Sequence, residues 1–124
     1  MTDAQDMIQG ACHCGAVTFE VSRPEFAVRC NCSTCRRYAA IWAHCPPNTG
    51  AILTGQDHVH GYSWGDRGIT FHSCKTCGCL THWGPGDNAQ GDRFAVNLNM
   101  ADPKDLDGLR VRRFDGADSW EFLD

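Results

Sequence analysis

The sequence predicts a mostly β domain with little helix. Apolar residues at Val17, Phe19 and Val21 alternate with polar Thr18 and Glu20, and this period of two is typical of a half-buried strand. Similar short stretches recur along the chain and are separated by glycine- and proline-rich turns. No stretch has helical periodicity long enough for a substantial helix. The pattern alone does not distinguish a barrel from a sandwich.

The expected strands follow one another between turn signals. They occupy residues 17–21, 26–28, 38–45, 51–53, 58–64, 69–72, 80–83, 94–99 and 111–114. Pro24, Pro46 and Pro47 stop strands or mark turns, because proline cannot donate a ladder hydrogen bond. A single helical turn is expected after Asp102, which would cap it, with Pro103 in the first helical position.

The length of 124 residues predicts one domain. We expect residues 1–9 to be a flexible N-terminal tail and residues 10–124 to form a single zinc-binding domain. The first residues are acidic and lack the basic start and apolar run of a signal peptide. No apolar run approaches the roughly 20 residues that a membrane span needs. We therefore expect a cytoplasmic protein with no membrane partner.

The chain is rich in cysteine and slightly acidic. It has nine cysteines and a formal net charge of −4. An odd number of thiols in a cytoplasmic chain favours metal binding over a disulfide framework. The acidic balance argues against a nucleic-acid partner, which would require a basic surface.

Two cysteine pairs lie far apart in the sequence: Cys12 with Cys14, and Cys74 with Cys77. Four thiolates from two separated pairs are typical of a closed structural zinc site. In an extended chain, residues i and i+2 lie roughly 6.5–7 Å apart, too far for one zinc ion. The chain must therefore bend at the first pair, where Gly10 and Gly15 permit it, and Gly78 permits the second turn. Spacing alone also allows buried thiols without metal, or Cys74 and Cys77 paired with Cys30 and Cys32.

A third cysteine cluster is followed directly by two arginines. It consists of Cys30, Cys32 and Cys35. Three thiolates with no obvious fourth ligand are typical of a zinc site with an open position, which a soft thiol substrate would suit. Arg36 and Arg37 are candidates to bind a carboxylate of that substrate, although they could also be a solvated pair. The alternative is a closed site completed by Cys79, Cys45 or a histidine.

Three further residues have less specific interpretations. Cys45, beside two prolines, is most simply a small buried hydrophobic residue. Cys79 could shield the structural site or be inert. His44 could carry a proton near neutral pH, or be an ordinary strand residue.

Taken together, these motifs resemble the glutathione-dependent formaldehyde-activating enzyme family, which includes centromere protein V. The resemblance covers residues 10–114 and rests on Gly10-x-Cys12-x-Cys14-Gly15-x-Val17-x-Phe19, Cys30-x-Cys32-x2-Cys35-Arg36-Arg37, Phe71-x2-Cys74-x2-Cys77-Gly78, Val96-Asn97 and Asp102-Pro103. It implies a β-tent of small antiparallel sheets around zinc. It also implies that Cys12, Cys14, Cys74 and Cys77 hold a structural zinc, and that Cys30, Cys32 and Cys35 hold a second one.

The resemblance also implies an activity. The founding enzyme joins glutathione to formaldehyde to give S-(hydroxymethyl)glutathione, a carbon–sulfur lyase reaction. This chain is considerably shorter than that enzyme. Its expected partners are glutathione or a similar small thiol and a small aldehyde. The alternative is a non-catalytic carrier of glutathione or formaldehyde, or a zinc-stapled interaction module.

Overall fold

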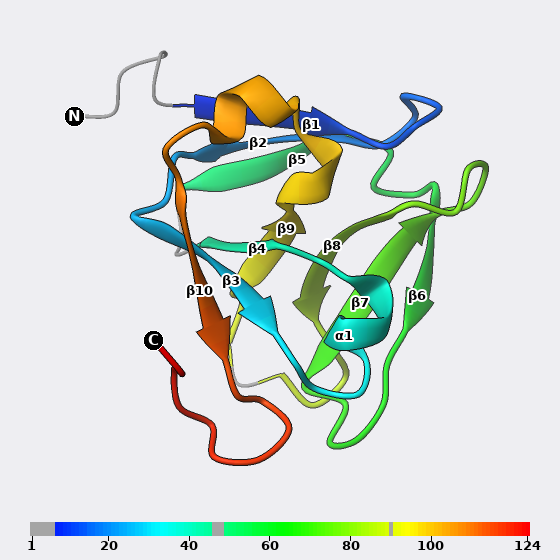
Figure 1. The fold of residues 1–124 in the computed structure, drawn as a ribbon. Helices are drawn as coiled ribbons and strands as arrows, with labels where there is room; N and C mark the ends of the chain where they lie inside the picture. The colour runs from blue at the N-terminus through cyan, green and yellow to red at the C-terminus, as the bar shows by residue number, and fades with distance from the viewer. Residues whose placement is uncertain (1–6, 46–48, 90) are drawn as a thin grey trace.

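The protein folds into two β-sheets. The computed structural model describes residues 7–45, 49–89 and 91–124. One sheet has three strands in the order β1-β2-β5, and the other has seven in the order β10-β3-β4-β9-β8-β7-β6. The smaller sheet lies across the top of the larger one (Figure 1). The predicted mostly β class is confirmed.

The elements are short throughout. They are β1 (Met7–Ala11), β2 (Thr18–Ser22), β3 (Phe26–Cys30), α1 (Cys35–Tyr38), β4 (Trp42–Cys45), β5 (Gly50–Thr54), β6 (Val59–Tyr62), β7 (Ile69–Cys74), β8 (Leu80–Pro85), β9 (Phe94–Asn97), the 3-10 helices η2 (Leu98–Met100) and η3 (Pro103–Leu106), and β10 (Arg110–Phe114). No helix in the described part of the chain is long and apolar enough to cross a membrane.

The three-stranded sheet begins earlier than the sequence predicts. Met7 to Gln9 were expected in a flexible tail, but they belong to β1, which pairs with β2 in antiparallel register. Ile8 is only 2% exposed because it packs with Phe19 and Val21 in the first core cluster. That burial stabilises a strand whose short sequence carries little signal of its own. Residues 1–6 lie outside the described residues.

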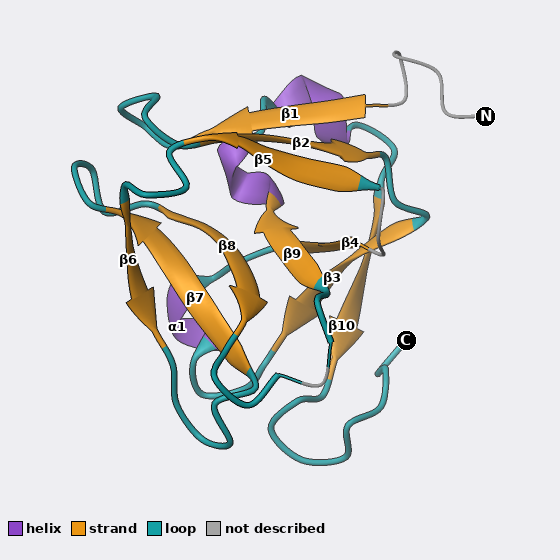
Figure 2. Cartoon of the chain, turned by 180° about the vertical axis from the view of Figure 1, so that it is seen from behind, coloured by secondary structure: helices purple, strands orange, loops and turns teal. Residues whose placement is uncertain are grey.

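The seven-stranded sheet contains one pairing that departs from the expected antiparallel arrangement. β10 runs parallel to β3, with Arg113 opposite Arg29, so the last strand lies beside the third one (Figure 2). The other neighbouring strands are antiparallel. An aromatic core of Trp42, Phe71 and Trp83 packs on one face of this sheet.

The expected strand over residues 38–45 is wrong in its first part. Tyr38 ends the one-turn helix α1, and β4 begins only at Trp42. Ala39 has a φ of 53°, a left-handed conformation that ends the helix, and its N–H donates to the Cys35 carbonyl. A four-residue helix is too short to show periodicity, so pattern alone could not find it.

The segment after β9 also differs from expectation, whereas the next one agrees. The expected strand to Asn99 stops at Asn97, whose side chain accepts a hydrogen bond from the Asn99 N–H and starts η2. In η3, Asp102 accepts from the Lys104 N–H at 3.0 Å and Pro103 stands in the first turn, which confirms the predicted capped turn.

Candidate functional site

The first cysteine cluster joins the two sheets. Its members are Cys12 and Cys14 after β1, Cys74 at the end of β7, and Cys77 in the following turn. The four sulfur atoms lie within 4.8 Å of one another, and Cys14 Sγ is 3.6 Å from both Cys12 Sγ and Cys74 Sγ. A tetrahedral zinc with bonds of about 2.3 Å holds sulfurs about 3.8 Å apart. The donor set therefore fits a closed four-thiolate zinc site.

Two glycines in left-handed conformations shape the turns of this cluster. Gly15 has a φ of 85° and donates its N–H to the Cys12 carbonyl, and Gly78 has a φ of 80° and donates to the Cys74 carbonyl. These turns aim backbone N–H groups at sulfur. The N–H groups of Cys79 and Cys14 lower the pKa of the Cys77 thiol to about 5. A thiol that is already acidic is a better metal ligand, because only the thiolate binds.

The second cluster lies where β3 passes into α1. It contains Cys30, Cys32 and Cys35, whose sulfurs also lie within 4.8 Å of one another. The Cys32 N–H lies 3.5 Å from Cys30 Sγ, and the Cys35 N–H lies 3.3 Å from Cys32 Sγ. The loop between β3 and α1 thus brings the three sulfurs together. This donor set fits a soft metal ion such as zinc and leaves one coordination position.

No fourth ligand joins this cluster among the residues that the structure describes. Cys45 is buried in the first core cluster, where burial raises the pKa of its thiol to about 11, as expected for a small hydrophobic residue. Cys79 packs beside the four-cysteine cluster instead. The His44 ring contacts the Trp83 ring, with centroids 5.8 Å apart.

The three thiols are electrostatically unequal. A hydrogen bond from Cys35, together with the N–H groups of Cys32 and Gly116, lowers the pKa of Cys30 to about 6. The pKa of Cys35 is raised, first by its hydrogen bond to Cys30 and then by burial. The buried Nε1–H of Trp42, which has no nitrogen or oxygen partner among the described residues, lies against Cys35 and opposes this rise.

A hollow of about 290 Å³ opens beside this cluster. Its lining residues are Arg29, Cys30, Asn31, Cys35, Arg36, Ala39, Arg113, Phe114 and Leu123. Arg29 and Arg113 are register partners on β3 and β10, so two cations lie side by side on neighbouring strands. Adjacent like charges are unfavourable without a counter-charge. Asp124 supplies part of it through a 3.6 Å ion pair with Arg113.

The two arginines singled out in the sequence have different surroundings. Arg36 lines the hollow, whereas Arg37 donates from Nη1 to the Ser33 carbonyl at 2.7 Å. Sequence reasoning missed Arg29 and Arg113. No local motif marks them, because the parallel pairing of β3 with β10 is what places them beside the cysteines.

The fold and the two clusters define a class of small β domains with preformed cysteine sites. The family model described as "Glutathione-dependent formaldehyde-activating enzyme" matches residues 7–110. The chain therefore belongs to the glutathione-dependent formaldehyde-activating enzyme family.

Two similar proteins extend this comparison. A Halomonas elongata protein, whose name assigns it provisionally to the glutathione-dependent formaldehyde-activating enzymes, is 32% identical over 81 residues. The match covers 57% of this chain and 52% of the relative, so the chain spans about half the length of that curated relative. A crystal structure of a Rhodobacter sphaeroides protein is 32% identical, with a TM-score of 0.66. The structural match covers 84% of this chain and 99% of the Rhodobacter sphaeroides chain.

Proposed function

We propose that this protein catalyses the addition of a carboxylate-bearing thiol, glutathione or a similar compound, to formaldehyde or a related small aldehyde. The observation that carries the proposal is the three-cysteine cluster beside a hollow lined by Arg29, Arg36 and Arg113. Membership of the family supports glutathione and formaldehyde as the substrates. The product would be an S-hydroxymethyl thiol, and the reaction class that of a carbon–sulfur lyase.

The reaction needs no oxidant or reductant. A bond forms between the thiol sulfur and the aldehyde carbon while the carbon–oxygen π bond opens. The proton that leaves the thiol is balanced by the proton that the new hydroxyl group gains. Because thiols and formaldehyde also react without a catalyst, the protein has to supply only binding, orientation and a stabilised thiolate.

Zinc fits both clusters. Cys12, Cys14, Cys74 and Cys77 would hold a structural zinc, and Cys30, Cys32 and Cys35 would hold the second one. When bound at the second cluster, zinc would supply a Lewis acid that favours the thiolate form of the substrate. The cysteines fix this position next to the hollow, and α1 keeps Cys35 at its buried side.

The arginines would orient the thiol compound. Arg36 projects from α1, and Arg29 and Arg113 project from neighbouring strands, so a carboxylate in the hollow could contact more than one guanidinium group. Glutathione carries two carboxylates, which suits a site with three cations. The hollow is small for a ligand pocket, so we expect part of the thiol compound to stay in solvent.

Exchange NMR on a mixture of formaldehyde and glutathione tests the proposal. We expect the zinc-loaded protein to accelerate exchange between free and S-hydroxymethyl glutathione. Cys32→Ser should abolish the acceleration while the domain stays folded, and Cys79→Ser, outside both clusters, should keep it. Glutathione binding without faster exchange would indicate a carrier instead. No glutathione binding would overturn glutathione as the substrate and leave another thiol or an interaction module.

A further inference from the structure

The last part of the chain contacts the three-cysteine cluster. Residues 115–124, here called the closing segment, leave β10 and fold back beneath the seven-stranded sheet (Figure 1). Backbone hydrogen bonds hold the fold-back, from Asp115 N to Glu121 O at 2.9 Å and from Leu123 N to Arg113 O at 2.9 Å. The family model ends at residue 110, so this segment lies outside the part of the chain that defines the family.

Gly116 of the closing segment lies against the sulfur of Cys30. A Cβ atom at this position would lie 2.5 Å from Cys30 Sγ and 3.4 Å from Cys32 Cβ. The φ of Gly116 is not left-handed, so the contact with sulfur, and not the backbone conformation, requires glycine here.

Asn31, which lies between Cys30 and Cys32 in the sequence, hydrogen-bonds to the residues on both sides of Gly116. Its Nδ2 donates to Asp115 Oδ1 at 3.0 Å, and its Oδ1 accepts from the Ala117 N–H at 3.0 Å. The Asp115 carboxylate also accepts from the Ser119 N–H and hydroxyl, at 3.2 and 2.9 Å. The register of the closing segment is thus fixed directly to the cysteine turn.

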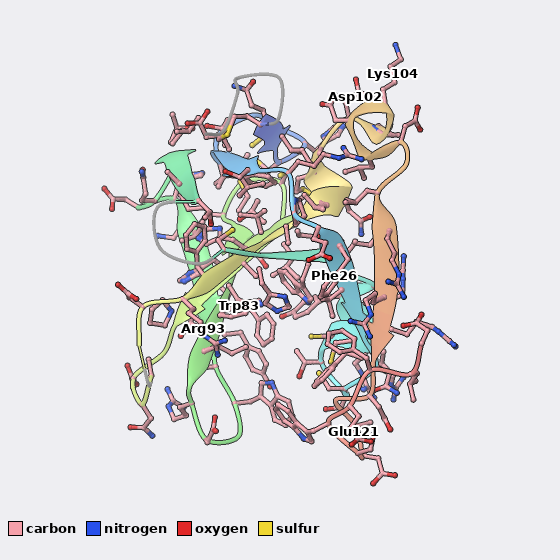
Figure 3. All side chains as sticks on the ribbon, turned by 90° about the vertical axis from the view of Figure 1, so that its left-hand side faces the viewer. Phe26, Trp83, Arg93, Asp102, Lys104 and Glu121 are labelled. Carbon is pink, nitrogen blue, oxygen red and sulfur yellow. The ribbon has the colours of Figure 1, made fainter. Side chains whose placement is uncertain are left out.

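Aromatic contacts anchor the rest of the closing segment. The Phe122 ring packs edge-on against Phe26 and Phe114, with centroids 5.6 and 5.2 Å apart, and the Arg112 guanidinium lies 3.9 Å from its centroid. Glu121 lies at the end of the molecule opposite Asp102, and Phe26 lies about midway between them (Figure 3). These contacts do not involve the cysteines, so the segment is held in place independently of a metal ion.

We propose that the closing segment is part of the second metal site, and that Gly116 and Asn31 are positioning residues for it. Gly116 packs against a ligating sulfur and leaves room for it, and Asn31 holds Gly116 in place. Residues packed behind a metal ligand fix its position, and their substitution typically changes metal affinity 10–100-fold. The inference rests on the proposed function only in taking the three-cysteine cluster as a metal site.

Zinc titration of the full chain against a chromophoric chelator tests this inference. Gly116→Ala should lower the zinc affinity of the three-cysteine cluster about tenfold or more and leave that of the four-cysteine cluster unchanged. Asp118→Ala, an exposed change in the same segment, should leave both sites unchanged. Far-UV circular dichroism and retention of the first zinc check that each variant is folded. Unchanged affinity of the second site in folded Gly116→Ala would overturn the inference.

A double-mutant cycle with Asn31→Ala and Asp115→Ala decides the matter if Gly116→Ala does not fold. Each single change should weaken the second site, and the effect of the double variant should be smaller than the sum of the two, because both changes remove the hydrogen bond between Asn31 and Asp115. Asn88→Ala, which frees a different loop, is the matched control. Unaltered zinc affinity in the cycle, or only one zinc bound by the wild-type chain, would overturn the inference. A wild-type chain without exchange activity but with these affinity changes would overturn the proposed function alone.

Discussion

Arg36 and Arg37 are neighbours in the sequence, but their guanidinium groups lie in different environments. Successive residues of a helix point about 100° apart, so only one of the two can face a given site. Arg36 lines the hollow, and Arg37 is held by the Ser33 carbonyl. Of the two arginines, Arg36 is therefore the one placed to contact a ligand in the hollow.

We expect Arg36→Ala to raise the KM for glutathione about tenfold, with a smaller effect on kcat, because a lost charge-assisted hydrogen bond costs about 1.4 kcal/mol or more. Arg37→Ala is the matched control and should stay near wild type. Steady-state kinetics by exchange NMR measures both. Equal effects of the two substitutions would contradict the assignment of Arg36 to the hollow.

The pairing of β7 with β8 places two histidines in contact. The rings of His72 and His82 stack with centroids 4.7 Å apart, and the His82 Nδ1 lies 2.8 Å from the Thr81 hydroxyl. His82 is 8% exposed. Burial, and then repulsion from His72, lowers the pKa of His82 to about 4, and burial also lowers the pKa of His72. Both rings are therefore neutral in the folded protein at pH 7.

The sign of the resulting pH dependence follows from proton binding. Between an unfolded pKa of about 6.5 and the folded pKa of about 4, the unfolded chain binds the extra proton. The stabilisation from a neutral His82 is complete above pH 6.5 and is lost as the pH falls toward 4. The His82 contribution to the free energy of unfolding should drop by about 1.4 kcal/mol per pH unit in that window.

We expect His82→Gln to flatten this dependence, which urea unfolding of the zinc-loaded protein between pH 7 and 5 can measure. Protonation of the cysteines affects the wild type and the variant alike, so the difference between their slopes isolates the histidine. His60→Gln, an exposed change on β6, should keep the wild-type slope. The same slope in His82→Gln as in the wild type would show that His82 is not the titrating group.

On the scale of the whole molecule, the four-cysteine cluster connects the two sheets. Cys12 and Cys14 follow β1 of the small sheet, and Cys74 ends β7 of the large one. Apparent zinc-binding free energies of about 10–16 kcal/mol are similar to or larger than the stability of most domains. The three-cysteine cluster lies within one stretch of chain and contributes less to joining distant strands.

Metal removal should therefore occur in two stages. As the chelator concentration rises, we expect zinc to leave the three-cysteine cluster first, with no change in the circular dichroism spectrum. Zinc should leave the four-cysteine cluster later, together with the β-sheet signal. Zinc release and circular dichroism, recorded in the same titration, distinguish the stages. If the β-sheet signal is lost when the first zinc ion is released, the assignment of the four-cysteine cluster as the structural site is wrong.

Substitution of one cysteine in each cluster distinguishes the roles of the two metal sites. Cys74→Ser should leave the protein unfolded, because one ligand of the site that joins the sheets is lost. Cys32→Ser should fold, bind one zinc per chain and lack the exchange activity. Zinc stoichiometry and thermal unfolding of the purified variants measure both outcomes. A folded Cys74→Ser with a wild-type Tm would show that burial alone holds the sheets together.

Features that depend on local chemistry could be predicted from the sequence. Alternating apolar residues predicted most strands, Asp102 and Pro103 predicted η3, and Gly15 and Gly78 marked the turns beside cysteines. Spacing also separated a three-cysteine run from two pairs. These signals are readable because each depends on residues a few positions apart.

The ligand pairing, the first strand and the arginine-lined hollow could not be predicted, because they depend on contacts between residues far apart in the sequence. The structure brings Cys74 and Cys77 to Cys12 and Cys14, the choice that spacing left open. β1 becomes a strand through the burial of Ile8, which its own short sequence does not reveal. The parallel pairing of β3 with β10 brings Arg113 and the closing segment to the three-cysteine cluster, and no local pattern encodes a pairing across more than eighty residues.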